Sequence, residues 1–196
     1  MITIVWDVDD VLNQLTRDWF EKQWLPEHPD CGVSFSGLRR NPPHELLNVT
    51  EREYLESLDR FRLSPQGEAM EPEPHVREWF CMHGGRCRHI ALTARPFSTV
   101  PCVADWIFRH FGAWVRAFGF VPAVRPGVNL PAYDERKAGW LEWIGSGDIL
   151  VDDNAGNIRE AAAGGLKTVL MPQPWNGGAT TIEGALEELS RMAGAV

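Results

Sequence analysis

The sequence has 196 residues, which is enough for one α/β domain with a small insert but not for two full domains. Hydrophobic residues make up 44% and charged residues 23% of the chain, which excludes a disordered, collagen-like or coiled-coil protein. The net charge of −8 argues against a partner bound by broad charge attraction, such as duplex nucleic acid or an anionic membrane surface.

Five short runs have the length of β-strands and are nearly continuous in apolar residues, which is typical of parallel strands covered on both faces. In chain order they are residues 2–8, 88–94, 117–124, 148–152 and 166–171. Helical patterns follow them at residues 98–111, 135–144, 157–163 and 182–192. Strands that alternate with helices predict an α/β fold: a doubly wound, Rossmann-like, mostly parallel five-stranded sheet with helices on both faces.

One segment breaks this alternation directly after the first strand. Residues 14–73 contain no convincing strand, and residues 16–24 and 50–61 within them have helical patterns. The sequence therefore predicts a helical insert at residues 14–73, within a core made of residues 1–13 and 74–196.

Cysteine spacing and the N-terminus indicate the compartment. The four cysteines form no CxxC pair and no dense framework, which favours reduced thiols. The chain reaches Asp7 before the apolar region of a signal peptide can form, and no apolar run approaches the about 18 residues of a membrane-spanning helix. We expect a soluble, cytoplasmic protein, a monomer or homodimer, with no nucleic acid polymer and no membrane as partner.

Polar residues gather at the ends of the predicted strands, where open parallel sheets bind their ligands. These residues are Asp7, Asp9 and Asp10 after the first strand, Thr93 in the second, and Asp152 and Asp153 at the fourth. Lys137 begins the predicted helix before the fourth strand. Crowded carboxylates repel one another unless a cation lies among them, and Mg²⁺ prefers oxygen ligands of this kind.

This set of groups suits phosphoryl transfer. An aspartate can be the nucleophile and form an aspartyl-phosphate. A metal ion, an ammonium and a hydroxyl then neutralise charge in the transition state. Asp9 lies two residues from Asp7, on the same side of an extended segment, where it is able to protonate a leaving group and then activate water.

These residues, in this order, resemble the four motifs of the haloacid dehalogenase superfamily of phosphohydrolases. The matches are DVDDVLN at residues 7–13, Thr93 in LTAR, Lys137 in DERKAGWLEWI, and Asp152 and Asp153 in ILVDDNAGN. The resemblance covers residues 1–13 and about 75–175, and the helical insert stands where this superfamily places a C1 cap. We expect the cap to close over the strand ends, with hinges near Asn13 and residues 72–74.

The resemblance implies a Mg²⁺-dependent phosphomonoester hydrolase that forms an aspartyl-phosphate intermediate. It implies that Asp7 is the nucleophile and Asp9 the general acid and base. The implied phosphate-binding residues are Thr93, Ala94 and Lys137. The implied Mg²⁺ ligands are Asp7, the backbone carbonyl oxygen of Asp9, and Asp152 or Asp153.

The substrate stays open at this level. Residues 65–69 read Pro-Gln-Gly-Glu-Ala, similar to the cap-closing turn of 5′(3′)-deoxyribonucleotidases but with an extra residue. A nucleoside monophosphate is therefore one alternative for the small phosphorylated substrate. The others are a phosphatase or phosphomutase for another small phosphorylated metabolite, and a catalytically silent binding protein on the same fold. Asp9 argues against a metal-free dehalogenase, which lacks that second acid.

Two expectations concern side chains outside the motifs. Trp79, Trp106, Trp140 and Trp143 fall on apolar helix faces and are predicted to lie in the core. Arg95 follows the second motif and is expected either to contact the substrate or to form a surface salt bridge.

Overall fold

The structure is a computed structural model that describes residues 1–126, 128–131, 133–178 and 180–194. Within these residues, five strands form one parallel sheet in the order β3-β2-β1-β4-β5. They are β1 (Thr3–Trp6), β2 (Arg88–Arg95), β3 (Val115–Pro122), β4 (Ile149–Asp152) and β5 (Lys167–Leu170). The predicted parallel sheet is confirmed. The predicted core includes residues 127, 132, 179, 195 and 196, which lie outside the described residues.

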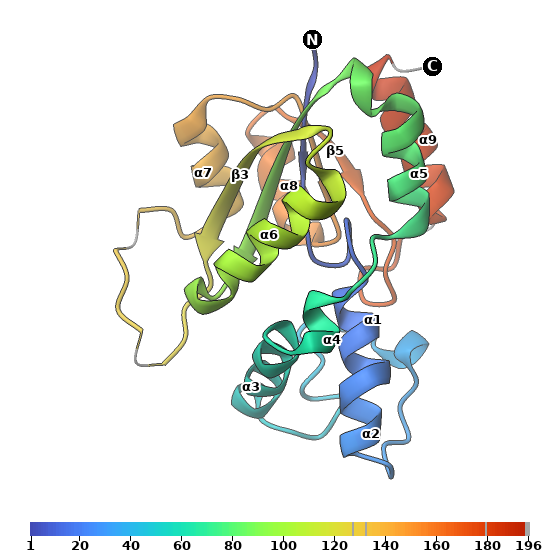
Figure 1. The fold of residues 1–196 in the computed structure, drawn as a ribbon, viewed down its shortest axis with the longest axis vertical. Helices are drawn as coiled ribbons and strands as arrows, with labels where there is room; N and C mark the ends of the chain where they lie inside the picture. Colours follow the sequence, from blue (N-terminus) through green and yellow to red (C-terminus); the bar gives the residue numbers. More distant parts are fainter. Residues whose placement is uncertain (127, 132, 179, 195–196) are drawn as a thin grey trace.

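Helices cover both faces of the sheet, as predicted (Figure 1). They are α5 (Pro74–His83), α6 (Val100–Phe111), α7 (Lys137–Ile144), α8 (Ala155–Ala163) and α9 (Ile182–Ala193). Ile4 and Trp6 of β1 pack in one hydrophobic cluster with α5, α6 and α9. Val5 between them points to the opposite face and packs with α7 and α8, because successive strand side chains alternate. None of the described helices combines the length and apolar character that crossing a membrane requires.

The insert, residues 14–73, is helical and has a hydrophobic cluster of its own. Its helices are α1 (Leu15–Trp19), α2 (Leu25–Glu27), α3 (Glu51–Arg62) and α4 (Pro65–Glu68), and a π-helical turn over Phe20–Trp24 joins α1 to α2. A capping box begins α3: Thr50 Oγ1 accepts from the Glu53 backbone N–H at 3.2 Å, and Glu53 Oε2 accepts from the Thr50 backbone N–H at 2.8 Å.

The chain leaves the core and returns to it at neighbouring points. Asn13 pairs with Pro72 in an antiparallel bridge, and the Glu73 N–H donates to the Leu12 carbonyl at 2.9 Å. Figure 1 shows the insert, coloured blue to teal, at the end of the sheet where β1 runs into α1. The insert therefore lies over the carboxyl ends of the strands, the position that closure of a cap requires.

The expectation that four tryptophans lie in the core holds for two of them. Trp79 and Trp106 are buried, and Trp140 is half-buried. The expectation for Trp143 is wrong, because its side chain is 71% exposed. Helix α7 rests on the sheet through Leu141, and Trp143 lies two residues further on, on the side of the helix that faces away.

Candidate active site

A cavity of about 160 Å³ lies between the insert and the carboxyl ends of the strands. Its core side is formed by strand-end residues and their neighbours: Asp7, Asp9, Asp10, Thr93, Ala94, Lys137, Asp153, Asn154 and Asn157. Its insert side is formed by Leu15, Thr16, Asn41, Tyr54, Leu58 and Arg62. The structure thus brings six of the seven predicted site residues to one cavity, and the seventh, Asp152, lies directly behind it.

Lys137 joins two of the predicted aspartates. Its Nζ lies 2.7 Å from Asp7 Oδ1 and 2.8 Å from Asp152 Oδ2. The Lys137 side chain is 3% exposed, and Asp152 is fully buried. Burial alone lowers the pKa of Lys137, but the Asp152 and Asp7 carboxylates beside it raise the pKa above its usual value. Lys137 therefore provides a fixed positive charge at the carboxylate predicted to be the nucleophile.

The Asp7 carboxylate is held through one of its oxygens. Oδ1 accepts from the Val8 N–H at 2.6 Å and also contacts Lys137. Oδ2 is then the oxygen that is able to attack phosphorus. Burial raises the pKa of Asp7 well above its usual value, and the Asp152 and Asp153 charges add to this effect against the opposing Lys137. One lysine does not compensate this group of carboxylates.

Three carboxylates form a cluster that suits a divalent cation. Oxygen atoms of Asp7, Asp152 and Asp153 lie within 4.8 Å of one another. Burial raises the pKa of Asp153 well above its usual value, and the neighbouring Asp10 and Asp152 raise it further. Buried acids of this kind ionise together when a cation lies among them, and hard oxygen donors fit Mg²⁺. The Asp9 side chain lies outside this cluster; the predicted ligand from Asp9 is its backbone carbonyl.

Besides the carboxylate cluster, the Thr93 hydroxyl also indicates a binding site. Thr93 is 1% exposed, and its Oγ1 has no hydrogen-bond partner among the described residues. A buried hydroxyl without a partner costs about 1–3 kcal/mol. Because Thr93 lines the cavity, a phosphate oxygen bound there is able to accept the hydrogen bond that the protein leaves open.

Replacing Thr93 by Val is expected to lower turnover of a phosphate ester by about 10- to 100-fold, the effect of one lost hydrogen bond to a charged group. The thermal midpoint should stay equal or rise, because no partner of the hydroxyl is left unpaired in the folded protein. Steady-state kinetics and thermal unfolding measure the two effects. Thr93→Ser keeps the hydroxyl and should retain most activity; a Val variant with full turnover would exclude the contact.

Asp9 is paired with two arginines, Arg95 and Arg62, of which only Arg95 was expected near the site. Arg95 Nε donates to Asp9 Oδ2 at 2.8 Å, with a second contact to Oδ1, and Arg62 of the insert donates to Oδ2 at 3.0 Å. Arg95 is 3% exposed, so this is a buried ion pair rather than the surface salt bridge that was one expectation. Burial raises the pKa of Asp9, but Arg95 and Arg62 lower it to about 2.

Arg62 also ties the insert to a second point of the core. Its Nη1 donates to Asp59 Oδ1 at 2.8 Å, and Asp59 Oδ2 accepts from Arg125 Nε, beyond β3, at 2.7 Å. The series Arg95–Asp9–Arg62–Asp59–Arg125 crosses between core and insert twice. No sequence signal marks Arg62, which lies in the last turn of an ordinary helix 53 residues after Asp9.

The loop after β5 supplies three further contacts that the sequence analysis missed. Trp175 Nε1 donates to Asp153 Oδ2 at 2.8 Å, and Asn176 Nδ2 donates to the Asp153 carbonyl at 2.8 Å. Gln173 Nε2 donates to the Asp10 carbonyl at 2.8 Å. Their position in the sequence could have indicated these contacts, because polar residues that follow the fifth strand lie at the same edge of the sheet as the predicted site.

Asp10 occupies a strained and buried position beside the cavity. Its φ is 61°, a conformation that Gly adopts freely and Asp tolerates. Its carboxylate accepts from the Thr16 N–H at 2.8 Å and from Thr16 Oγ1 at 2.5 Å. Burial raises the pKa of Asp10 from 3.8 to about 7, in spite of these hydrogen bonds.

In chelator, the thermal midpoint is expected to fall by several degrees as the pH rises from about 4 to about 7. In this window folded Asp10 keeps a proton that the unfolded chain releases, so raising the pH favours unfolding. The raised pKa values of Asp7 and Asp153 act in the same direction. Thermal unfolding across pH measures the slope, and Asp10→Asn should flatten it. A midpoint that rises over this window would contradict the prediction.

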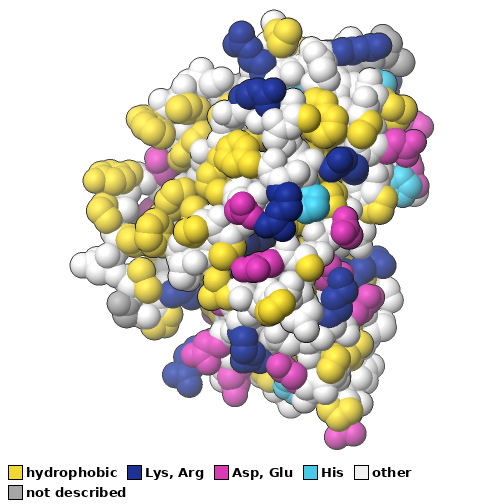
Figure 2. All heavy atoms as spheres, viewed as in Figure 1, with side chains coloured by type: hydrophobic (Ala, Val, Ile, Leu, Met, Phe, Trp, Pro, Cys, Tyr) yellow, Lys and Arg dark blue, Asp and Glu magenta, His cyan; other side chains and the backbone are white. Residues whose placement is uncertain are grey.

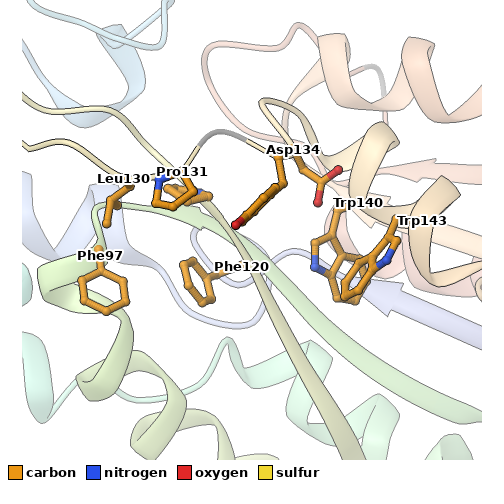
Figure 3. Close-up of a pocket in the computed structure, with 9 residues that line it drawn as sticks. Phe97, Phe120, Leu130, Pro131, Asp134, Trp140 and Trp143 are labelled. Atoms are coloured by element: carbon orange, nitrogen blue, oxygen red, sulfur yellow. The ribbon is translucent and has the colours of Figure 1, made fainter.

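A larger cavity of about 870 Å³ lies elsewhere, against the end of β3. Figure 3 shows Phe97 and Phe120 at one end of it and Trp140 and Trp143 at the other. Figure 2 shows apolar side chains gathered on this side of the molecule. Among the described residues that line this cavity, Asp134 alone is charged. Since phosphate recognition needs cations or unpaired donors, the smaller cavity is the candidate active site.

Comparison with known proteins gives matches only among solved structures, since no protein-family model and no curated protein sequence matches this chain. A hydrolase from Streptococcus pneumoniae TIGR4 aligns over 96% of this chain and 97% of its own, at 14% identity and a TM-score of 0.59. A haloacid dehalogenase-superfamily hydrolase of subfamily IA from Geobacter sulfurreducens PCA aligns over 98% of this chain and 96% of its own, at 18% identity and a TM-score of 0.55.

A third similar structure is a candidate β-phosphoglucomutase from Thermotoga maritima. It aligns over 97% of this chain and 99% of its own, at 16% identity and a TM-score of 0.51. All three alignments include the insert as well as the sheet, because they span nearly the whole chain. The protein therefore has the fold of the haloacid dehalogenase superfamily, with a helical insert after β1.

Proposed function

We propose that this protein is a Mg²⁺-dependent phosphomonoester hydrolase that works through an aspartyl-phosphate on Asp7. One observation supports this best: Asp7, the Lys137 ammonium and the Thr93 hydroxyl, which has no partner among the described residues, line a single cavity. These groups are a nucleophile, a hydrogen-bond donor without an acceptor, and a fixed cation. A phosphate group is the substrate moiety that needs all three.

In the first step, the substrate phosphate accepts a hydrogen bond from Thr93 Oγ1 while Lys137 compensates its charge. Asp7 Oδ2 attacks phosphorus, the bond to the leaving oxygen breaks, and the phosphoryl group remains on Asp7. Asp7, Asp152 or Asp153 and the Asp9 carbonyl would hold a Mg²⁺ ion here, which would supply charge neutralisation on the phosphate oxygens. Water then hydrolyses the aspartyl-phosphate and releases inorganic phosphate.

Asp9 has a task in both steps. It gives a proton to the leaving oxygen in the first and takes one from the attacking water in the second. With both arginines in contact its pKa is about 2, so in this arrangement it is ionised and suits the second task. Arg62 belongs to the insert, so opening of the insert would withdraw one of the two charges and let Asp9 take up a proton.

The size of the cavity bears on the substrate. Pockets for drug-sized ligands measure about 300–1,000 Å³, whereas this cavity measures about 160 Å³. We propose a small phosphate ester as the substrate, since a nucleoside monophosphate fits only if the insert opens. A panel of short alkyl phosphates, sugar phosphates and nucleoside monophosphates separates these classes. Transfer to a second hydroxyl of the substrate, without release of inorganic phosphate, would indicate a phosphomutase; turnover of no ester would indicate a binding protein.

The metal is tested directly. Hydrolysis of an aryl phosphate is expected to vanish in excess chelator and to return on addition of Mg²⁺. Asp153→Asn should raise the Mg²⁺ concentration needed for half-maximal activity, because it removes one charged ligand of the cluster. Glu183→Gln, at the exposed start of α9 and outside both the cluster and the cavity lining, is the matched control and should leave that concentration unchanged. Full activity in chelator would exclude the metal mechanism.

A further inference from the structure

Trp175 contacts both the carboxylate cluster and the insert. Its Nε1 donates to Asp153 Oδ2 at 2.8 Å. Its ring also meets the ring of Phe35 in the insert edge-to-face, with centroids 6.2 Å apart and an interplanar angle of 86°. One indole therefore links a carboxylate of the core to an aromatic side chain of the insert.

Phe35 is fixed on the insert side. It lies in a 3₁₀ turn over Phe35–Gly37 and packs against the hydrophobic cluster of the insert. The Arg17 guanidinium of α1 lies over the Phe35 ring, 4.6 Å from its centre. Because α1 also holds the ring, Phe35 moves with the insert as a whole.

The loop that carries Trp175 is fixed on the core side. Asn176 Nδ2 donates to the Asp153 carbonyl at 2.8 Å and to the Met171 carbonyl at 2.7 Å. Asn176 Oδ1 accepts from the backbone N–H groups of Gln173 and Gly178, both at 3.1 Å. The backbone of the loop is thus held by the core, and the indole of Trp175 is half-buried.

We propose that Trp175 is a positioning residue for Asp153, and that Phe35 holds the Trp175 indole in place when the insert is closed. Binding of a divalent cation and closure of the insert then favour each other. This inference rests on the proposed Mg²⁺ site. The indole N–H fixes the orientation of the Asp153 carboxylate; if the insert opens, Phe35 leaves and the ring is free to turn. Coupling between two equilibria is reciprocal, so bound cation must in turn favour the closed insert.

Direct Mg²⁺ titration by calorimetry, without substrate, tests the positioning role. Trp175→Phe keeps a ring for Phe35 to contact but has no N–H, and its Mg²⁺ affinity should fall by about 10- to 100-fold, as for other residues that orient metal ligands. Phe35→Leu keeps the N–H and should weaken binding by about two- to tenfold, the range of one aromatic contact. Phe108→Leu, an exposed aromatic of α6, is the matched control and should bind like the wild type.

The double variant distinguishes coupling from two independent losses. If Phe35 acts only by holding the Trp175 indole in place, Phe35→Leu should have no further effect on Mg²⁺ affinity in the Trp175→Phe background. Thermal midpoints measured in chelator should lie well above the temperature of the titration for all variants, which separates this role from unfolding.

Hydrogen exchange gives the reciprocal readout. In the wild type, Mg²⁺ should slow exchange at residues 35–37 and along α1, and this effect should be absent from Phe35→Leu at saturating Mg²⁺. If Trp175→Phe binds Mg²⁺ as tightly as the wild type, this inference is overturned while the proposed hydrolase stands. The same holds if the losses of Mg²⁺ affinity in the two single variants add up in the double variant. If the wild type binds no Mg²⁺, the proposed metal site and this inference both fail.

Discussion

Asp7→Asn is expected to release no phosphate from any ester and to form no phosphoenzyme. The amide has no anionic oxygen to attack phosphorus, although it keeps the size of the carboxylate and one oxygen that accepts from the Val8 N–H. Rapid acid quench followed by mass measurement of the intact protein detects a covalent phosphoryl group, and phosphate release measures turnover.

The control for this variant is its stability. Burial and the Asp152 and Asp153 charges raise the pKa of Asp7, against the opposing Lys137. Because Lys137 keeps its ion pair with Asp152 in the variant, removing the Asp7 charge should leave the thermal midpoint in chelator unchanged or higher. Inactivity together with an intact fold assigns the loss to the chemistry. A covalent phosphoryl group on the Asp7→Asn protein would place the nucleophile elsewhere.

Asp9→Asn is expected to lose about 10²–10⁴-fold of the rate on an alkyl phosphate, the usual contribution of a general acid and base. The loss on an aryl phosphate should be much smaller, because an aryl oxide leaves without needing a proton. The measurement is the ratio of the two rates, in the wild type and in the variant.

Stability must be followed for this variant as well. Arg95 and Arg62 both donate to Asp9, and removing one partner of a buried ion pair costs about 3–5 kcal/mol. Both rates should therefore be measured at a temperature well below the thermal midpoint of the variant. An equal loss on both esters would mean that Asp9 only holds the two arginines or organises the metal, and the acid–base role would be excluded.

The pH response separates Asp9 from its neighbour Asp10. The pKa of Asp9 is lowered to about 2, so its ion pairs stabilise the fold above its usual pKa and are lost only in strong acid. The pKa of Asp10 is raised to about 7, so its effect has the opposite sign and falls near neutral pH. These two adjacent residues differ because Asp9 is paired with two arginines, whereas Asp10 is buried without a cationic partner among the described residues that lowers its pKa.

The sheet and the convergence of the motif residues follow from the sequence with one topological rule. Continuous apolar runs separated by helical patterns require a parallel sheet, and parallel strands end at one edge. Asp7, Thr93 and Asp153 each stand at such an end, and Lys137 opens a helix at the same edge. Their meeting in one cavity was therefore predictable without any knowledge of side-chain packing.

Only the tertiary structure decided which other side chains reach these residues. Arg62 and Phe35 come from the insert, and Trp175 comes from the loop after the last strand. Helical periodicity in the insert tells which face is apolar, but not how the insert docks on the core. Docking is set jointly by many contacts between segments far apart in the chain. An ordinary arginine at the end of α3 and a tryptophan beyond β5 acquire their partners only through that arrangement.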